Sequence, residues 1–342
     1  MTDTLIDVPT TKPAETTPYV RPDVRGFLAY LNSVPGPKMH EMEAPAARQV
    51  YRAMKDVADL PVGELGAIVD LNIPGPAGAI RARLFDVAAT RVPGPAMMFF
   101  HGGGFVIGDI DTHASACAAI SRGLGMPVIS VDYRLAPECP WPAAPEDCEA
   151  ASRWVAGSPA ALGRTVTGLV LCGDSAGGTL AITTAMALRD EPAAVPVIVQ
   201  APLYPAADAI KEYPSYAQFA EDHLLTRAGM EWFMAAYRPD ATHWRASPLS
   251  GDLTGLPPAV IVTASLDPIR DQGRAYAAAL IRHGVPVVYR EAAGNVHGFL
   301  SLRQAIPSSQ GDVAGFLAAV KAMVAEVEGA RVSAQAAGGI GT

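Results

Sequence analysis

The sequence GLVLCGDSAGG at residues 168–178 decides the fold. An apolar run, typical of a strand buried on both faces, leads into a turn of small residues, and a helical segment rich in Ala, Thr and Leu follows. The pattern Gly-x-Ser-x-Gly between a strand and a helix predicts a sharp turn that presents the Ser175 hydroxyl at the end of a sheet. Small residues are needed there because the strand and the helix approach each other closely. Ser175 is therefore the predicted nucleophile.

Strand-like and helix-like segments alternate on both sides of this turn. The strand candidates are short apolar runs with little internal polarity, as expected for parallel strands buried on both faces: 96–100, 128–133, 168–172, 197–203, 259–264 and 287–291. Helical patterns separate them at 114–124, 145–156, 176–189, 269–283 and 312–328. This alternation predicts an α/β fold, with a mostly parallel sheet covered by helices on both sides. Ahead of it, residues 68–73 and 79–85 flank a turn sequence and predict a hairpin-like pair.

Two helix-rich regions stand outside this alternation. Apolar stripes that begin at Val24 and Val50 predict two amphipathic helices, preceded by a mobile tail or loosely docked arm up to about residue 20. A helix-rich insert follows a predicted strand, at the end of a sheet where open α/β folds bind ligands. We expect both regions to form a cap over the site. The predicted organisation is an N-terminal arm with cap helices (1–60), a catalytic domain in two parts (61–205 and 246–332), the cap insert between them (206–245) and a disordered tail (333–342).

Composition narrows the class of protein and its partners. Half of the 342 residues are hydrophobic and 18% are charged, which favours a globular fold with a buried core. A formal net charge of -8, without any Lys/Arg-rich run, argues against binding to nucleic acid or to anionic membrane surfaces. No apolar stretch approaches the roughly 20 residues of a spanning helix, and residues 1–11 lack the basic and apolar regions of a signal peptide. We expect no membrane association and a cytoplasmic location.

The cysteines do not form a metal-binding or disulfide pattern. They show no Cys-x-x-Cys pair and lie among apolar or small residues, at Cys117, Cys139, Cys148 and Cys172. Buried free thiols are the expected state, with a disulfide or a metal site as the less favoured alternative. The sequence therefore predicts no metal site.

A second motif, HGGGF at residues 101–105, directly follows the predicted strand 96–100. Consecutive glycines allow the backbone N–H groups to turn inward, where no side chain obstructs the carbonyl oxygen of a substrate. The predicted oxyanion-hole donors are Gly103, Gly104 and Ala176, the residue after the nucleophile. The alternative is a merely flexible glycine loop. His101 precedes the serine, whereas the triad of a Gly-x-Ser-x-Gly enzyme runs Ser, acid, His, so His101 is expected to hold this loop by hydrogen bonds.

The acid and the base are expected on loops after later strands. Asp267 follows the predicted strand 259–264, and His297 follows the strand 287–291. One strand–helix–strand unit separates them, so adjacent strands would present the two side chains together. In an acyl transfer, Ser175 attacks, His297 carries the proton to the leaving alcohol, and Asp267 fixes the tautomer of the imidazole and stabilises its charge.

Other acidic and histidine residues are weaker candidates for the triad. Asp271 is expected one turn into the next helix, and Asp174 is better explained as a structural hydrogen-bonding residue. His283 is placed at the end of a helix, where a positive charge is favourable. The remaining histidines have no comparable sequence context and are expected to be structural or solvent-exposed: His40, His113, His223 and His243.

Taken together, these motifs resemble the bacterial hormone-sensitive-lipase family of esterases, in the branch that carries Gly-Asp-Ser-Ala-Gly. The matching stretches follow one another in the family's order and span about 200 residues: 101–105, 133–138, 173–178, 267–271 and 297–299. The resemblance implies the α/β-hydrolase fold, with an eight-stranded, mostly parallel sheet and a helical cap. It also implies cofactor-free hydrolysis of short- to medium-chain acyl esters. The stretch 133–138 is interpreted as a structural support beneath the oxyanion loop.

The resemblance extends to residues that would contact the substrate. Leu224 and Phe233, in the insert, would line the acyl pocket, although both could equally be part of the core of the cap. Phe105, beside the oxyanion loop, is the third predicted substrate contact. Gln272 departs from the family, which usually has Glu at this position, and the change could alter the support of the Asp267 loop.

Alternative functions share part of this sequence pattern. An acyltransferase, a lactonase or an amidase would pass through the same Ser175 ester and differ only in the group that resolves it. A binding protein is a further alternative, because the plant gibberellin receptors resemble this family but have lost the catalytic histidine; His297 argues against it. The expected partner is a small-molecule ester, and the expected assembly is a monomer or a homodimer.

Overall fold

Eight strands form one sheet in the computed structural model, which describes residues 17–338. Their order across the sheet is β1-β2-β4-β3-β5-β6-β7-β8. Strands β3 to β8 run parallel, whereas β1 and β2 form the predicted antiparallel hairpin at one edge. The predicted α/β-hydrolase sheet is confirmed. The strand bounds are β1 Ala67–Gly75, β2 Gly78–Asp86, β3 Gly94–Phe100, β4 Val128–Asp132, β5 Val166–Asp174, β6 Val197–Leu203, β7 Ala259–Leu266 and β8 Val287–Val296.

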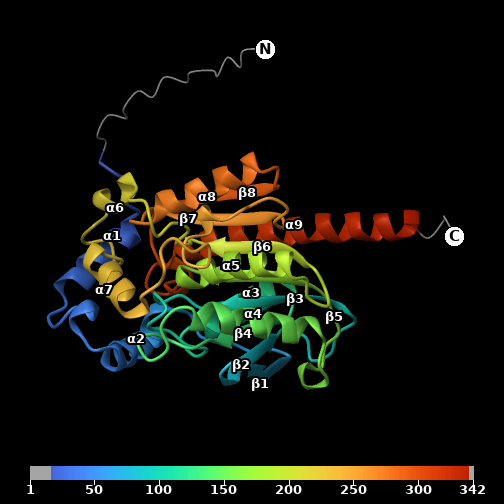
Figure 1. Cartoon of the computed structure of the whole chain (residues 1–342). Helices are drawn as coiled ribbons and strands as arrows, with labels where there is room; N and C mark the ends of the chain where they lie inside the picture. Colours follow the sequence, from blue (N-terminus) through green and yellow to red (C-terminus); the bar gives the residue numbers. More distant parts are fainter. Residues whose placement is uncertain (1–16, 339–342) are drawn as a thin grey trace, which may run out of the picture.

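Helices cover both faces of this sheet (Figure 1). Helices α3 and α9 pack on one face, and α4, α5 and α8 pack on the other. The bounds of the helices are α1 Pro22–Ser33, α2 Ala44–Ala58, α3 Ala114–Leu124, α4 Ala143–Ala156, α5 Ala176–Asp190, α6 Pro214–Gln218, α7 Arg227–Tyr237, α8 Arg270–Arg282 and α9 Ser309–Gly338. Four short 3-10 helices complete the described elements: η1 Met39–Glu41, η2 Ala160–Leu162, η3 Pro248–Ser250 and η4 Phe299–Ser301.

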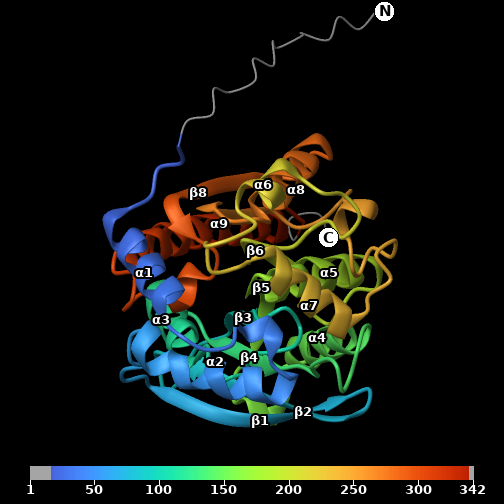
Figure 2. The ribbon, with the colours of Figure 1, turned by 90° about the vertical axis from the view of Figure 1, so that its left-hand side faces the viewer.

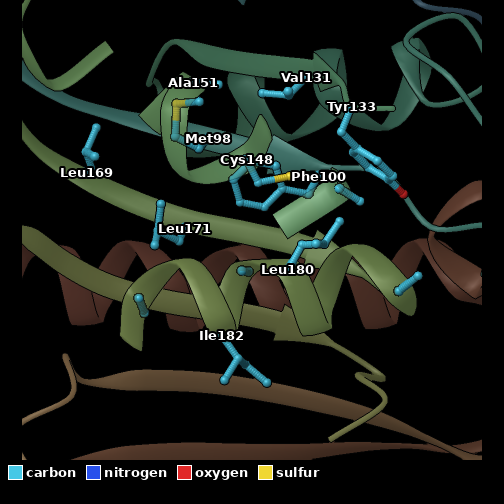
Figure 3. Close-up of a cluster of buried hydrophobic side chains, with 14 of the residues drawn as sticks. Met98, Phe100, Val131, Tyr133, Cys148, Ala151, Leu169, Leu171, Leu180 and Ile182 are labelled. Atoms are coloured by element: carbon cyan, nitrogen blue, oxygen red, sulfur yellow. The ribbon is translucent and has the colours of Figure 1, made fainter. Parts of the chain in front are cut away.

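The apolar strands are buried on both faces, which explains why their sequences lack alternation. Successive side chains of a strand point to opposite faces. In β3, Met98 and Phe100 therefore join the core beneath α4 and α5, while Met97 and Phe99 join the core beneath α3 and α9. Figure 3 shows the first of these cores, in which strand side chains meet residues of α4 and α5: Met98, Phe100, Leu169 and Leu171 from the sheet, Cys148 and Ala151 from α4, and Leu180 and Ile182 from α5.

Four helices lie over the carboxyl ends of the parallel strands (Figure 2). We call them the covering helices: α1 and α2 from the N-terminal region, and α6 and α7 from the insert after β6. The two regions, far apart in sequence, meet where α7 packs against η1. This places the covering helices at the end of the sheet where Ser175 emerges.

The N-terminal region is fastened to the sheet by Arg21. Its guanidinium donates to both carboxylate oxygens of Asp312, at 2.6 and 2.9 Å, and to the carbonyl oxygen of Ala293 at 2.7 Å. Arg21 thus holds the N-terminal region against β8 and α9. The predicted mobile arm falls mainly on residues 1–16, which lie outside the described residues.

The prediction of a disordered tail from Ser333 was wrong where the structure describes it. Helix α9 continues through Ser333 to Gly338 and extends beyond the sheet (Figure 1). Alanine has the highest intrinsic helix propensity, so the Ala-rich sequence at 334–337 extends a helix that is already nucleated. Residues 339–342 lie outside the described residues.

Candidate active site

The register of β7 and β8 brings Asp267 and His297 together. Leu266 and Val296 are paired across the two strands, and each is the last residue of its strand. Their successors, Asp267 and His297, therefore leave the sheet side by side. Strand β8 extends five residues beyond the predicted end at Glu291.

Ser175, His297 and Asp267 form a continuous chain of hydrogen bonds. The Nε2 atom of His297 lies 2.8 Å from Ser175 Oγ, and its Nδ1 lies 2.7 Å from Asp267 Oδ2. Asp267 is fully buried, and its other oxygen accepts the N–H of Ile269 at 2.9 Å, which fixes the plane of the carboxylate. A carboxylate can only accept, so Nδ1 carries the proton and the lone pair of Nε2 faces the serine hydroxyl. This arrangement can remove the proton of Ser175.

Ser175 is held in a strained conformation by the elements on either side of it. It has φ 55° and ψ −120°, a region that costs a non-glycine residue about 1–3 kcal/mol. Its N–H donates to the carbonyl oxygen of Leu203 at 2.9 Å, and helix α5 begins at the next residue. A side chain at Gly177 would overlap the carbonyl oxygen of Phe100, which is why the turn requires glycine there. The strain directs the hydroxyl out of the sheet.

The glycine loop after β3 lies beside this turn. Phe100 is paired with Gly173, so the loop that starts at His101 runs next to Asp174 and Ser175. Both Gly103 and Gly104 have positive φ, 117° and 59°. Within residues 17–338, the N–H groups of the predicted oxyanion donors, Gly103, Gly104 and Ala176, have no protein acceptor. They are free to bind a negatively charged oxygen.

Residues around His101 support this loop from below. His101 Nδ1 donates to the carbonyl oxygen of Gly102 at 2.8 Å, and Tyr133 Oη donates to the carbonyl oxygen of His101 at 2.7 Å. The rings of His101 and Tyr133 stack at a centroid distance of 4.3 Å, and the N–H of Ala136 donates to the carbonyl oxygen of Phe105. Burial lowers the pKa of His101 to about 4, so this imidazole is neutral. His101 thus bonds to the loop and not to Ser175.

The insert after β6 brings two of the predicted substrate contacts close to the site. The ring of Phe233, on α7, lies against Gly104, where a Cβ atom would collide with it. Leu224 lies near Gly298, the residue after His297. Phe105, by contrast, is buried and stacks on Tyr237 at a centroid distance of 3.8 Å. Phe233 thus lies against the loop that carries two of the free N–H groups, and Leu224 lies near the residue that follows His297.

Asp271 and the remaining histidines lie apart from this chain of hydrogen bonds. Asp271 accepts the N–H of Ser215 at 3.0 Å and is paired with Arg270 and Arg274, so it links α6 to α8. His283 caps the C-terminal end of α8, as its position in the sequence indicates. His113 is also outside this chain, but it is fully buried and its Nε2 lies 3.4 Å from Asp174 Oδ1. Sequence reasoning gave His113 no specific partner.

Gln272 supports the start of the insert. Its Oε1 accepts the N–H groups of Ala207 at 3.0 Å and Asp208 at 3.1 Å. The residue is 7% exposed, so these two bonds are shielded from water. The departure from Glu therefore preserves an acceptor, without its charge, at the point where the chain leaves β6 for the covering helices.

We predict that Gln272→Leu lowers the free energy of unfolding by about 1–3 kcal/mol, because two backbone N–H groups lose their acceptor. Gln272→Glu is the matched control, since a carboxylate accepts the same two bonds and should keep the stability within about 1 kcal/mol. Urea unfolding followed by circular dichroism measures both. Equal stability of the leucine variant and the unsubstituted protein would contradict this role.

The described part of the chain has no cluster of side chains typical of a metal centre. Cys117, Cys148 and Cys172 are buried free thiols, whereas Cys139 is only half-buried, so the expectation of burial was too broad for that residue. No group of three or more His, Cys, Asp or Glu side chains among the described residues could hold a metal ion.

No helix within residues 17–338 is long and apolar enough to cross a membrane.

Comparisons with known proteins agree with the fold. The family described as alpha/beta hydrolase fold matches residues 97–301. Esterase LipI of Mycobacterium tuberculosis is 37% identical over 76% of this chain and 83% of its own length. Carboxylic ester hydrolase LipN of the same organism is 38% identical over 76% of this chain and 71% of its own length. A solved structure of an alpha/beta hydrolase enzyme from the metagenome of Lake Arreo, Spain, superposes with a TM-score of 0.85 at 35% identity, covering 89% of this chain and 98% of that one. The chain belongs to the α/β-hydrolase fold family, in its bacterial hormone-sensitive-lipase branch.

Proposed function

We propose that this chain is a carboxylesterase that hydrolyses short- to medium-chain acyl esters through a covalent intermediate on Ser175. The observation that carries the proposal is the hydrogen-bonded chain from Asp267 through His297 to Ser175, at 2.7 and 2.8 Å. The free N–H groups of the glycine loop lie beside it. The names of the relatives, an esterase and a carboxylic ester hydrolase, support the same class of reaction.

In the acylation half, Ser175 Oγ attacks the carbonyl carbon of the ester while His297 Nε2 takes the hydroxyl proton. The carbonyl oxygen becomes negatively charged and accepts hydrogen bonds from Gly103, Gly104 and Ala176. The N-terminus of α5, which begins at Ala176, favours the same negative charge. When the C–O bond to the alcohol breaks, His297 returns its proton to the leaving oxygen.

Deacylation repeats these steps with water. His297 removes a proton from a water molecule, the hydroxide attacks the acyl carbon, and the same N–H groups stabilise the second tetrahedral intermediate. The acid leaves and the proton returns to Ser175 Oγ. Throughout, Asp267 stabilises the charge on the imidazolium and keeps its proton at Nδ1.

The covering helices limit the length of the acyl chain in this proposal. The described part of the N-terminal region, residues 17–60, and the insert, residues 206–245, act as a cap on the catalytic domain. Phe233 against Gly104 and Leu224 near Gly298 place apolar side chains next to the reacting carbon. An acyl group of a few carbons would fit against them, whereas a long chain would have to displace them.

A series of p-nitrophenyl esters from acetate to palmitate tests the proposal. We expect kcat/KM to peak between acetate and hexanoate and to fall for laurate and palmitate. A Phe233→Ala variant should shift the optimum toward longer acyl chains, because it opens the space over Gly104. Activity that rises steadily toward palmitate would contradict the esterase assignment in favour of a lipase.

A further inference from the structure

A buried ionisable cluster lies directly behind the nucleophile. Asp174, the residue before Ser175, is 5% exposed, and His101 and His113 are fully buried next to it. Asp174 Oδ1 accepts the N–H of Gly102 at 2.8 Å and therefore fixes the start of the oxyanion loop. A buried carboxylate at this place is costly, because its charge lies where catalysis creates a second negative charge.

Thr112 contacts His113 Nδ1 and takes part in a local network of hydrogen bonds with Asp109. Thr112 Oγ1 accepts the N–H of Asp109 at 2.9 Å and donates its own proton to the carbonyl oxygen of Asp109 at 2.9 Å. Thr112 Oγ1 also lies 3.0 Å from His113 Nδ1. Because the hydroxyl proton is already used, the oxygen can only accept a hydrogen bond there. With the Thr112 proton donated to the carbonyl oxygen of Asp109, His113 Nδ1 carries a proton and donates it to Thr112.

The opposite nitrogen of His113 faces the Asp174 carboxylate. Nε2 lies 3.4 Å from Asp174 Oδ1, longer than an ideal hydrogen bond but within the range of an ion pair. A lone pair on Nε2 would face a carboxylate oxygen and be repelled by it. With protons on both nitrogens, His113 is an imidazolium cation and neutralises Asp174.

The surroundings of His113 agree with a single charged imidazole. Its ring faces Tyr51, Phe99 and His101 at centroid distances of 6.3, 6.0 and 5.5 Å. Burial alone would lower the pKa of His113, but Asp174 and Asp109 together outweigh burial and the pKa is raised. For His101 the balance is reversed, because burial and the charge of His113 both lower its pKa. Beyond Thr112, Asp109 forms an ion pair with Arg52 of α2.

We propose that His113 is a positioning residue that holds Asp174, and through it the oxyanion loop, and cancels the negative charge behind Ser175. The inference rests on the proposed esterase function, because its benefit arises when a substrate oxygen becomes negative. An unpaired Asp174 carboxylate would oppose that charge in a poorly screened, water-excluded site. Substrate binding, before the charge develops, would be little affected.

His113→Gln and Asp174→Asn form the test pair. In His113→Gln the carboxylate is left unpaired, so we expect kcat for p-nitrophenyl butyrate to fall by about 10- to 100-fold, with KM within about threefold. Adding Asp174→Asn removes the negative charge, while the amide oxygen still accepts the N–H of Gly102. The double variant should recover at least about tenfold of the lost kcat. If the loss of kcat in the double variant equals the product of the losses in the two single variants, His113 does not act through Asp174, and the proposal is overturned.

The charge of His113 can be measured without activity. In the ¹⁵N-histidine NMR spectrum of the unsubstituted protein at about pH 8, both nitrogens of His113 should be protonated, well above the ordinary histidine pKa of about 6.5. The signal is assigned in the unsubstituted protein by correlating the imidazole with the backbone of His113. A neutral His113 at that pH would refute the inference even if the glutamine variant failed to fold. Absence of ester hydrolysis by the unsubstituted protein would instead count against the proposed function alone.

Discussion

Replacing Ser175 with alanine is expected to lower kcat for p-nitrophenyl butyrate by about a millionfold, to the level left by the oxyanion site and binding alone. His297 Nε2 has Ser175 Oγ as its partner at 2.8 Å, so the variant leaves the base without a nucleophile to activate. The fold should persist, because the N–H of Ser175 that bonds to Leu203 belongs to the backbone. Steady-state assay and thermal unfolding measure the two effects.

Ser301→Ala is the matched control for that experiment. Ser301 follows His297 on η4, and its buried hydroxyl has no hydrogen-bond partner in the part of the chain that the structure describes. Its removal should leave kcat within about twofold. Residual activity above about 1% in Ser175→Ala, or an equal loss in both variants, would remove Ser175 from the mechanism.

Asp267→Asn is expected to lower kcat by about 10⁴, with the fold retained. The N–H of Ile269 donates to Asp267 Oδ1, so the amide oxygen of the variant must stay at that position. The amide NH₂ then faces His297 Nδ1 and donates to it. This stabilises the tautomer with its proton on Nε2, which cannot accept the proton of Ser175.

Asp271→Asn controls for the loss of a nearby carboxylate. Asp271 pairs with Arg270 and Arg274 and holds Ser215, so its change should affect stability more than turnover. We expect kcat of this variant within about threefold of the unsubstituted protein. If Asp271→Asn had a lower kcat than Asp267→Asn, the assignment of Asp267 as the triad acid would be wrong.

The positions of Ser175, Asp267 and His297 could be predicted because they depend on strand ends. Parallel strands place their carboxyl ends on one edge of the sheet. Residues that directly follow neighbouring strands therefore lie close together. The predicted strand ends can differ from the observed ends by a few residues without changing which residue follows the strand into the site. Strand β8 ends at Val296 and not at Glu291, yet His297 still follows the strand.

Features that depend on tertiary contacts could not be predicted in this way. The extension of β8 includes Gly294 at φ 73°, a residue with little strand propensity. It lies in an irregularity between Ala292 and Val296, which both pair with residues of β7. The role of Gln272 lies in bonds to backbone N–H groups 65 and 64 positions earlier in the chain. His113 looked unremarkable because its partner, Asp174, belongs to a distant strand.

Acid quenching during the first turnover of p-nitrophenyl butyrate, followed by peptide mass spectrometry, tests the central claim most directly. The predicted result is one butyryl group per chain, attached to Ser175, with no such adduct in Ser175→Ala. The N–H groups and the imidazole arranged around Ser175 Oγ account for its formation and its later hydrolysis. A butyryl group on another residue, or ester turnover without an acylated Ser175, would contradict the mechanism.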